Sequence, residues 1–459
     1  MRSRDLRAEM SPLLKLAFPL ILGELGWVAM TLVDTIMVGR MQEPALNMAA
    51  SALAGVLFNT VAFGIAGVLL GLDSVISEAF GAEDIPAANR WLLHGFAMAS
   101  LLALALLAVF TATPVVLGHF PVDKQILVRA IPALRGLTWG VVPLLAYFVL
   151  RRYLQAAHQA KPIAFALISA NLVNIAFDWL LIYGHRFAGY TVPAFGVVGS
   201  SWATSLARLY LMLVLVVALW RADRHKGFRL SATPLRIETE HLRRIWVLGA
   251  PVGAQILIEI AIFALVTSLI ATFGALPLAG HEIALQCAST SFMVPLAICS
   301  ATAVRVGHAL GKVRIGTGTV VEAEAAGWSG ILAGAAVMLI SAICFLFIPG
   351  IIAGLFTPDP AVIAGAVPLL RIAACFQFFD GIQVVAAGAM RGAGKTTTPL
   401  WTHIVCYWLV GMPLGWVLAF PLHLGPRGLW MGLVIALGGA AVVLVASWTR
   451  LTRQLQAGL

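Results

Sequence analysis

The fold is decided by residues 12–38, which read PLLKLAFPLILGELGWVAMTLVDTIMV. This run is long enough to cross a bilayer, which takes about 20 predominantly apolar residues. It is too long for the apolar part of a secretory signal, which has about 7–15 residues. It also carries two acids, Glu24 and Asp34. We therefore predict a retained first membrane span with ionisable groups inside it.

The rest of the chain repeats this pattern. Hydrophobic residues make up 61% of the 459 residues and charged residues 11%, against about 25% charged residues in an ordinary soluble domain. Apolar runs of about 20 residues, closed by charges, Gly or Pro, recur from end to end. The predicted spans are 12–38, 48–72, 91–111, 127–150, 162–184, 196–220, 245–273, 280–303, 326–350, 361–390, 399–421 and 427–449. The sequence therefore predicts an all-α polytopic membrane protein with about twelve transmembrane helices.

The basic residues indicate how the chain is oriented in the membrane. Most of the 30 Lys and Arg residues fall in the termini and in alternate connections, and they form no single patch that would suit nucleic acid. The opposite connections hold Arg40, Lys124, Arg186 and Arg427. Because cytoplasmic loops carry the excess of Lys and Arg, we predict a multi-pass protein of the cell (inner) membrane with both termini in the cytoplasm.

The two halves of the chain resemble each other. The block at 118–135 recurs at 354–371, each with Gly-x-Phe-x-x-Asp followed by Pro-x-Leu-Arg. We infer an internal duplication, with an N-lobe bundle at 1–225, a cytoplasmic linker at 226–244 and a C-lobe bundle at 245–459. Six spans per half is an even number, so both bundles insert the same way. We expect two six-helix bundles related by a pseudo-twofold axis, around a central cavity.

Ionisable groups inside the N-lobe spans point to a cation site. Each such group costs roughly 2.5–3.5 kcal/mol at a helix centre. Asn171, Asn174 and Asp178 share one helical face. With Asp34 and Thr204 they could surround Na⁺ with oxygen ligands or hold a proton on a buried carboxyl group. The alternative is that these side chains only bond one another between helices, although two carboxylates are a costly way to achieve that.

The C-lobe carries its own buried acids, Glu259 and Asp380. We expect them to form a second cation site, chemically different from the first; the alternative is that either acid pairs with a buried arginine such as Arg371. His94 and His403 lie in apolar spans without partners at metal-ligand spacing, so we interpret both as packed or cavity-lining residues. Further candidate cavity residues are Glu24, Phe292, Phe376 and Gln377.

Several short segments give the chain a family resemblance. They are Val33–Gly39 (VDTIMVG), Ile256–Glu259 (ILIE), His281–Gln286 (HEIALQ), Arg305–Gly311 (RVGHALG), and Asp380–Val384 (DGIQV) through Arg391-Gly392. In these segments, and in its duplicated six-span halves, the chain resembles the NorM-like branch of the multidrug and toxic compound extrusion (MATE) family over nearly its whole length.

The resemblance implies a secondary active transporter that exports amphiphilic, often cationic, drugs and dyes by antiport with Na⁺ or H⁺, through alternating access of two lobes. It places coupling at Asp34, Asn174 and Asp178 in the N-lobe and at Glu259 and Asp380 in the C-lobe, and Na⁺ could occupy either set. It implies no enzymatic activity and no cofactor besides the coupling ion, and we expect a monomer. The alternative is a lipid-linked precursor flippase of the same superfamily, which would favour a more basic cavity.

Overall fold

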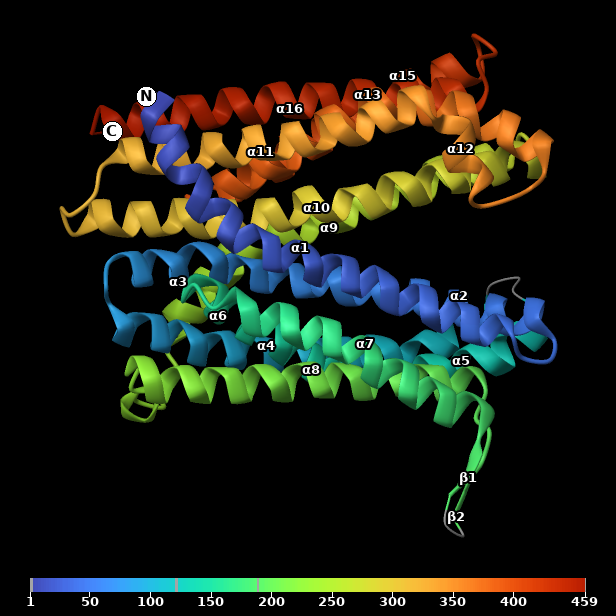
Figure 1. Cartoon of the computed structure of the whole chain (residues 1–459), viewed down its shortest axis with the longest axis horizontal. Coiled ribbons are helices and arrows are strands. Elements are labelled where there is room, and N and C mark those ends of the chain that lie inside the picture. Colours follow the sequence, from blue (N-terminus) through green and yellow to red (C-terminus); the bar gives the residue numbers. More distant parts are fainter. Residues whose placement is uncertain (1–2, 120–122, 188–189, 459) are drawn as a thin grey trace. The chain divides into compact units, whose positions relative to one another are not determined.

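The computed structural model describes residues 3–119, 123–187 and 190–458, nearly all of them helical (Figure 1). Phe120 of the repeated block lies outside the described residues. The first half of the chain contains α1 (Ser3–Gly39), α2 (Pro44–Ala66), η1 (Gly67–Gly71), α3 (Leu72–Gly81), α4 (Ile85–Leu117), α5 (Lys124–Thr138), α6 (Val141–Ala156), α7 (Ala160–Tyr183), the antiparallel strands β1 (His185–Phe187) and β2 (Tyr190–Val192), and α8 (Val197–Lys226). The sequence did not predict this hairpin.

The second half is helical throughout its described elements. It contains η2 (Leu230–Ala232), α9 (Thr239–Ala271), α10 (Ala275–Arg314), α11 (Val320–Phe347), α12 (Pro349–Gly354), α13 (Pro360–Gly392), α14 (Thr397–His403), η3 (Ile404–Gly411), α15 (Met412–Ala419) and α16 (Pro426–Gln456).

The helices match the predicted spans. Among the described residues, 11 continuous helical stretches are long and apolar enough to cross a membrane, and α5 with α6, bent by 43° at their junction, would make a twelfth. Several helices run past the predicted ends; α10, for example, has 40 residues. Backbone groups in hydrocarbon must be hydrogen-bonded within the protein, and a helix satisfies them within one segment. The all-α polytopic fold is confirmed.

The described residues form two compact units. Unit 1 comprises the described part of 1–21, Asp73–Glu83 and Ala254–Leu459, and unit 2 comprises Leu22–Leu72 and Asp84–Gly253. The beginning of α1 and most of α3 thus pack with helices of the second half. The lobes predicted at 1–225 and 245–459 describe the sequence repeat and stay a prediction.

In unit 1, ion pairs hold α1 and α3 to α10 and α13. Arg305 Nη2 lies 2.7 Å from Glu9 Oε2, and Arg391 Nε lies 3.1 Å from Asp73 Oδ2. The Asp73 side chain is 1% exposed and that of Arg391 is 11% exposed. A buried ion pair of this kind becomes strongly unfavourable when one partner is removed, so it ties α3 firmly to α13.

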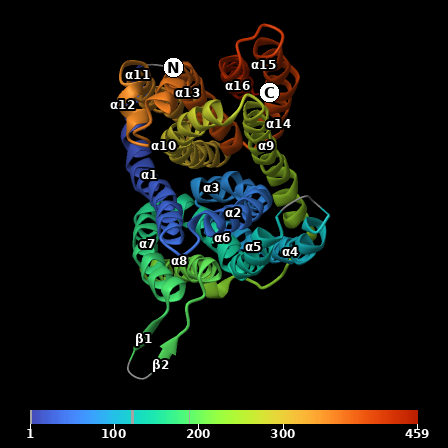
Figure 2. The ribbon, with the colours of Figure 1, turned by 90° about the vertical axis from the view of Figure 1, so that its right-hand side faces the viewer.

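Small residues let α13 approach α10 within the same unit, where α13 packs against α10, α11 and α16 (Figure 2). A Cβ added at Gly392 would lie 2.4 Å from the Ala303 carbonyl oxygen, and one at Gly388 would lie 2.6 Å from the Cys299 carbonyl oxygen. Membrane helices associate through such close backbone contacts because lipid provides no hydrophobic driving force between them.

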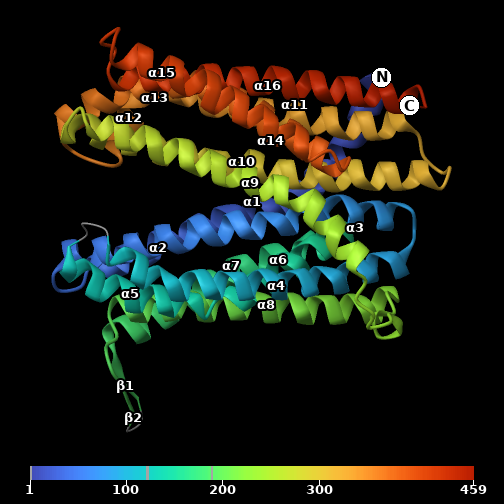
Figure 3. The ribbon, with the colours of Figure 1, turned by 180° about the vertical axis from the view of Figure 1, so that it is seen from behind.

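In unit 2, α8 packs along α7, and α5 lies against both α2 and α8. In unit 1, α14, η3 and α15 follow one another as a single span beside α16 (Figure 3). The η3 segment is a π-helix, and Pro413 follows it directly. Proline has no N–H to bond the carbonyl group four residues earlier, which helps to explain the irregular turn there.

The tight contact between α10 and α13 yields a stability prediction. Gly392→Ala should lower the free energy of unfolding by about 1–3 kcal/mol, because the new methyl group has no room and the backbones must move apart. The measurement is the thermal unfolding midpoint of the purified protein in detergent. Gly350→Ala is the matched control, since nothing lies within 4 Å of a Cβ added there. Equal midpoints for the two variants would contradict the proposed packing.

Candidate cation and substrate sites

Unit 2 contains the first candidate site, which we call the N-site: Asp34 on α1, Asn174 and Asp178 on α7, and Thr204 on α8. The Thr204 hydroxyl group donates to Asp34 Oδ2 at 3.2 Å. Asp34 is also within side-chain reach of Asp178 and Asn174. Asn174 and Asp178 are completely buried. The packing of α1, α7 and α8 therefore brings four of the five predicted N-lobe residues together.

The N-site has more acceptors than donors. Asp34 Oδ1, both carboxylate oxygens of Asp178 and both amide atoms of Asn174 are buried, and none of them has a partner with hydrogen-bond geometry among the described residues. Two ionised carboxylates so close in a medium of low dielectric constant repel each other. This repulsion favours the binding of a proton or a cation by the pair.

A buried arginine lies near this acidic pair. The Arg208 guanidinium group is stacked over the Phe58 ring, with its carbon 4.3 Å from the ring centroid. Arg208 interacts electrostatically with Asp34, but the two side chains form no ion pair within 4.0 Å in the described part of the chain. Arg208 therefore supplies a nearby positive charge but does not occupy the Asp34 carboxyl group through a direct ion pair.

Two predicted residues lie apart from the N-site. The Asn171 side chain turns back to its own helix, where its Nδ2 donates to the Leu167 carbonyl oxygen at 2.8 Å. Glu24 forms an ion pair with Arg151 on α6. It lies ten residues before Asp34 on α1, about 15 Å along the helix axis. Glu24 is therefore neutralised by a structural partner, which the sequence analysis did not identify.

Unit 1 contains the second candidate site, which we call the C-site: Glu259 on α9, Asp380 and Gln383 on α13, and His403 on α14. His403 Nε2 lies 2.7 Å from Glu259 Oε1 and 3.0 Å from Gln383 Oε1. Gln383 Nε2 donates to Asp380 Oδ1 at 3.0 Å. The two predicted acids thus belong to one network, linked through a histidine and a glutamine that the sequence analysis did not assign to the site.

The hydrogen bonds of His403 require an additional proton. Its Nδ1 lies 2.6 Å from the Pro399 carbonyl oxygen, which can only accept, so Nδ1 carries a hydrogen. Its Nε2 faces two more oxygens, Glu259 Oε1 and Gln383 Oε1. A neutral ring has one donor and one acceptor nitrogen, so either the ring is doubly protonated or Glu259 carries the proton. The hydrogen-bond geometry therefore places one additional proton between Glu259 and His403.

Two other buried histidines serve as internal comparisons. His281 accepts a hydrogen bond from the Trp430 indole N–H at 3.1 Å on Nδ1, and its Nε2 lies 2.8 Å from the Thr267 hydroxyl group. His94 Nδ1 donates to the Arg90 carbonyl oxygen, and its Nε2 accepts from the Glu238 backbone N–H. A neutral ring satisfies each of these partner sets. Of the three buried histidines among the described residues, His403 alone needs the additional proton.

The local backbone explains how His403 reaches this position. It is the last residue of α14, immediately before the π-helical η3. Its ring stacks on that of Tyr407, with centroids 5.2 Å apart. Single turns of π-helix inside α-helices occur frequently at functional sites. A lone histidine in an apolar run gives no sequence signal of this geometry, which is why it was interpreted as a packed or cavity-lining residue.

The remaining candidates lie beside the C-site or away from it. Phe376 is buried and packs against Trp430, with ring centroids 5.8 Å apart. Gln377 is buried and donates to the Ser291 hydroxyl group, and Phe292 is half-buried. Arg371 is exposed, and it forms no ion pair with Glu259 or Asp380 within the described residues. The alternative pairing with Arg371 is therefore wrong for the C-site.

The donor set bears on which ion each site could bind. No group of three or more His, Cys, Asp or Glu side chains suited to a metal ion occurs among residues 3–119, 123–187 and 190–458. A Na⁺ ion in the N-site would therefore depend on the Asn174 and Thr204 oxygens in addition to the two carboxylates. At the C-site, His403 Nε2 lies 2.7 Å from Glu259 Oε1, so Na⁺ would compete with the histidine for that oxygen. The geometry thus favours a proton over Na⁺ at the C-site. At the N-site it is compatible with either H⁺ or Na⁺.

The chain is similar to known proteins over nearly its whole length. The chain is 33% identical to "Probable multidrug resistance protein NorM" of Bradyrhizobium diazoefficiens, over 96% of this chain and 93% of that protein. It is 32% identical to "Multidrug resistance protein MdtK" of Pectobacterium atrosepticum, over 96% and 95% of the two chains. A solved structure described as the outward-facing conformation of a multidrug resistance MATE family transporter superposes with a TM-score of 0.87 at 21% identity, covering 99% of this chain and 98% of that one.

A family model described as MatE matches residues 19–180 and again residues 251–417. One model that matches each half is what an internal duplication predicts. The matched residues contain Asp34, Asn174 and Asp178 in the first stretch, and Glu259, Asp380 and His403 in the second. The chain belongs to the MatE family of membrane transporters.

Proposed function

We propose that this protein is a multidrug efflux antiporter of the cell (inner) membrane, with both termini in the cytoplasm, which expels amphiphilic cationic compounds in exchange for protons. Relatives more than 30% identical over nearly the whole chain carry multidrug resistance names, which supports drugs as the substrates. The observation that carries proton coupling is the titratable proton shared between Glu259 and His403.

The proposed exchange depends on differential affinity. A ligand shifts a conformational equilibrium only by the difference between its affinities for the two states. Proton occupancy of the C-site and drug occupancy of the transporter therefore favour opposite states. Proton entry promotes drug release outside, and drug binding inside promotes proton release. Asp380 contributes a second carboxyl group to the same network through Gln383.

The N-site adds a second acidic centre. Asp34 and Asp178 favour the binding of a proton or a cation, and a cationic drug could provide the charge as well as Na⁺ or H⁺. One proton exchanged for one monovalent drug moves no net charge, and the proton gradient then supplies about 1.4 kcal/mol per tenfold concentration ratio. A second coupled ion would add about 2.3 kcal/mol per 100 mV. Two acidic sites make this stoichiometry available.

The acidic character of both sites favours cationic drugs over the anionic lipid-linked precursors of a flippase. At the C-site, Glu259 and Asp380 are joined by a histidine and a glutamine, without lysine or arginine among the hydrogen-bonded partners described above. Arg208 is the basic residue beside the N-site.

The first test compares two buried histidines. His403→Gln should reduce pH-gradient-driven dye efflux from proteoliposomes by roughly tenfold or more. Without the imidazole ring, the proton between residues 259 and 403 has only Glu259 to bind to, so the two conformational states differ less in their affinity for protons. His281→Gln is the control, since that residue is also buried but its partners are satisfied by a neutral ring. Equal losses in the two variants, or full activity of His403→Gln, would refute the role of His403.

The second test distinguishes the coupling ions. An inwardly directed proton gradient should drive dye out of proteoliposomes, and an inwardly directed Na⁺ gradient at equal pH should not, because His403 is bonded to Glu259 Oε1 and competes with Na⁺ for that oxygen. The measurement is dye fluorescence after each gradient is imposed separately, with an ionophore that collapses the gradient as the control. Efflux driven by Na⁺ alone would overturn proton coupling.

The third test distinguishes a cation site from interhelical hydrogen bonding. Asp34→Asn should leave the thermal unfolding midpoint in detergent equal or raised, because it removes the repulsion between two carboxyl groups and keeps a side chain of similar shape, while transport falls. If these residues merely bonded the helices together, the same substitution would cost about 0.6 kcal/mol or more. A lowered midpoint with unchanged transport would support the bonding interpretation instead.

A further inference from the structure

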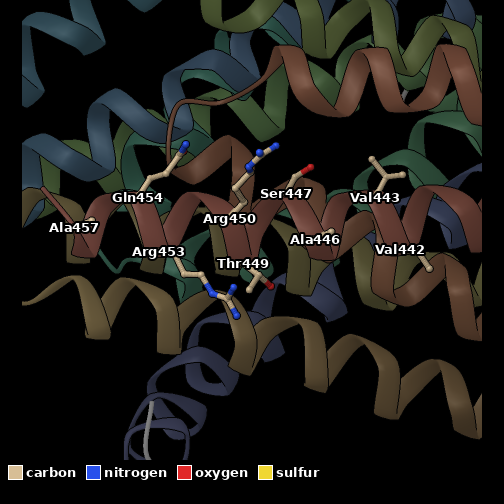
Figure 4. Close-up of a pocket in the computed structure, with 9 residues that line it drawn as sticks. All are labelled: Val442, Val443, Ala446, Ser447, Thr449, Arg450, Arg453, Gln454 and Ala457. Carbon is tan, nitrogen blue, oxygen red and sulfur yellow. The ribbon is translucent and has the colours of Figure 1, made fainter. Parts of the chain in front are cut away.

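A surface groove on the last helix has features that neither candidate site uses. It is a hollow of about 790 Å³ lined by residues of α16: Val442, Val443, Ala446, Ser447, Thr449, Arg450, Arg453, Gln454 and Ala457 (Figure 4). Its volume is within the range of about 300–1,000 Å³ typical of small-molecule sites. It lies entirely in unit 1 and far along the chain from the acids of the C-site.

The lining residues are ordered by polarity along the helix. Val442, Val443 and Ala446 come first, the hydroxyl groups of Ser447 and Thr449 follow, and the charged and amide groups come last. A glycerophospholipid has the same order, from acyl chain through glycerol esters to phosphate. Eleven residues separate Val442 from Arg453, roughly 16 Å of helix, and half of a bilayer's hydrocarbon core is about 15 Å.

The two arginines are available to a ligand. Arg450 and Arg453 are exposed, and neither forms an ion pair with a carboxylate in the described part of the chain. The nearby Glu324 accepts a hydrogen bond from Gln456 at 2.8 Å. In Figure 4, Arg450 and Gln454 extend to one side of the helix and Arg453 to the other. Residues three apart on a helix have Cβ atoms about 5–6 Å apart, so a change of side-chain rotamer is enough to bring both guanidinium groups to one phosphate.

We propose that this groove binds an anionic phospholipid of the cytoplasmic leaflet, with its phosphate held by Arg450 and Arg453 and one acyl chain lying along Val442, Val443 and Ala446. Two guanidinium groups recognise phosphate oxygens through charge-assisted hydrogen bonds, and anionic lipids attract basic groups at this surface. The leaflet follows from the predicted cytoplasmic C-terminus. The binding itself does not depend on drug efflux.

The competing explanation is that Arg450 and Arg453 only reflect the general excess of Lys and Arg at the cytoplasmic ends of membrane helices, and bind no particular lipid. The chain contains a matched control for this, because α8 is the last span of the first half and carries Arg221 and Arg224 near its C-terminal end at Lys226. The Arg224 guanidinium carbon lies 3.9 Å from the centroid of the Trp220 ring. Replacing these two arginines removes the same charge from the same predicted leaflet without altering the groove.

The experiment measures lipid binding to the purified full chain by native mass spectrometry. Phosphatidylglycerol and phosphatidylcholine with identical acyl chains are titrated separately, and glycerol 3-phosphate is a third probe. Wild type should retain phosphatidylglycerol in preference to phosphatidylcholine, and glycerol 3-phosphate should bind weakly, since it has no acyl chain to bury.

The variants decide the outcome. The double variant Arg450→Gln/Arg453→Gln should lower phosphatidylglycerol affinity about fivefold or more, and Arg221→Gln/Arg224→Gln should change it less than about twofold. Ala446→Trp fills the apolar part of the groove and should weaken phosphatidylglycerol binding while leaving glycerol 3-phosphate unaffected. Equal losses in the two arginine double variants, or unchanged binding in both α16 variants, would overturn the proposal. Dye efflux is not part of the readout, so failure here leaves the proposed transport function intact.

Discussion

The structure depends on one constraint: hydrocarbon offers no hydrogen-bonding partner to a polar group. The backbone meets this constraint by forming helices long enough to cross the bilayer. Close contacts at glycines such as Gly388 and Gly392 let those helices pack without a hydrophobic driving force. Buried charged side chains satisfy the same constraint by forming ion pairs, as Asp73 and Arg391 do. Polar groups that remain without such partners therefore stand out as functional candidates.

The two candidate sites meet the same constraint in different ways. In the N-site, carboxylate oxygens of Asp34 and Asp178 are buried without a donor in hydrogen-bond geometry among the described residues. A proton or a cation would satisfy these oxygens. The C-site completes its hydrogen bonds by sharing a proton between Glu259 and His403. In the antiporter that we propose, these sites are the places where coupling ions bind and leave. The difference between them agrees with the expectation that the two halves, although repeated in sequence, carry different chemistry.

Much of this could be predicted from the sequence, and the physical reasons are specific. Long apolar runs fix the number and order of the spans, because span length is set by bilayer thickness. The spacing of Asn174 and Asp178 is a local helical property, so their common face on α7 was predictable, whereas the approach of Asp34 and Thr204 depends on how α1 and α8 pack beside α7. The role of His403 was not predictable, since Glu259 is distant in the sequence and the π-helical turn after His403 has no clear sequence signature. The pairing of Glu24 with Arg151 was missed for the same reason, because it depends on tertiary packing.

The most direct test of the account is a measurement of proton release on drug binding. Purified protein in weakly buffered detergent is mixed with a saturating cationic dye, and a pH indicator records released protons while dye fluorescence records binding. Because proton and drug occupancy are linked reciprocally, the account predicts release of about one proton or more per bound dye, and a clear reduction in Glu259→Gln. Dye binding of normal affinity with no proton release at any pH near neutrality would contradict it.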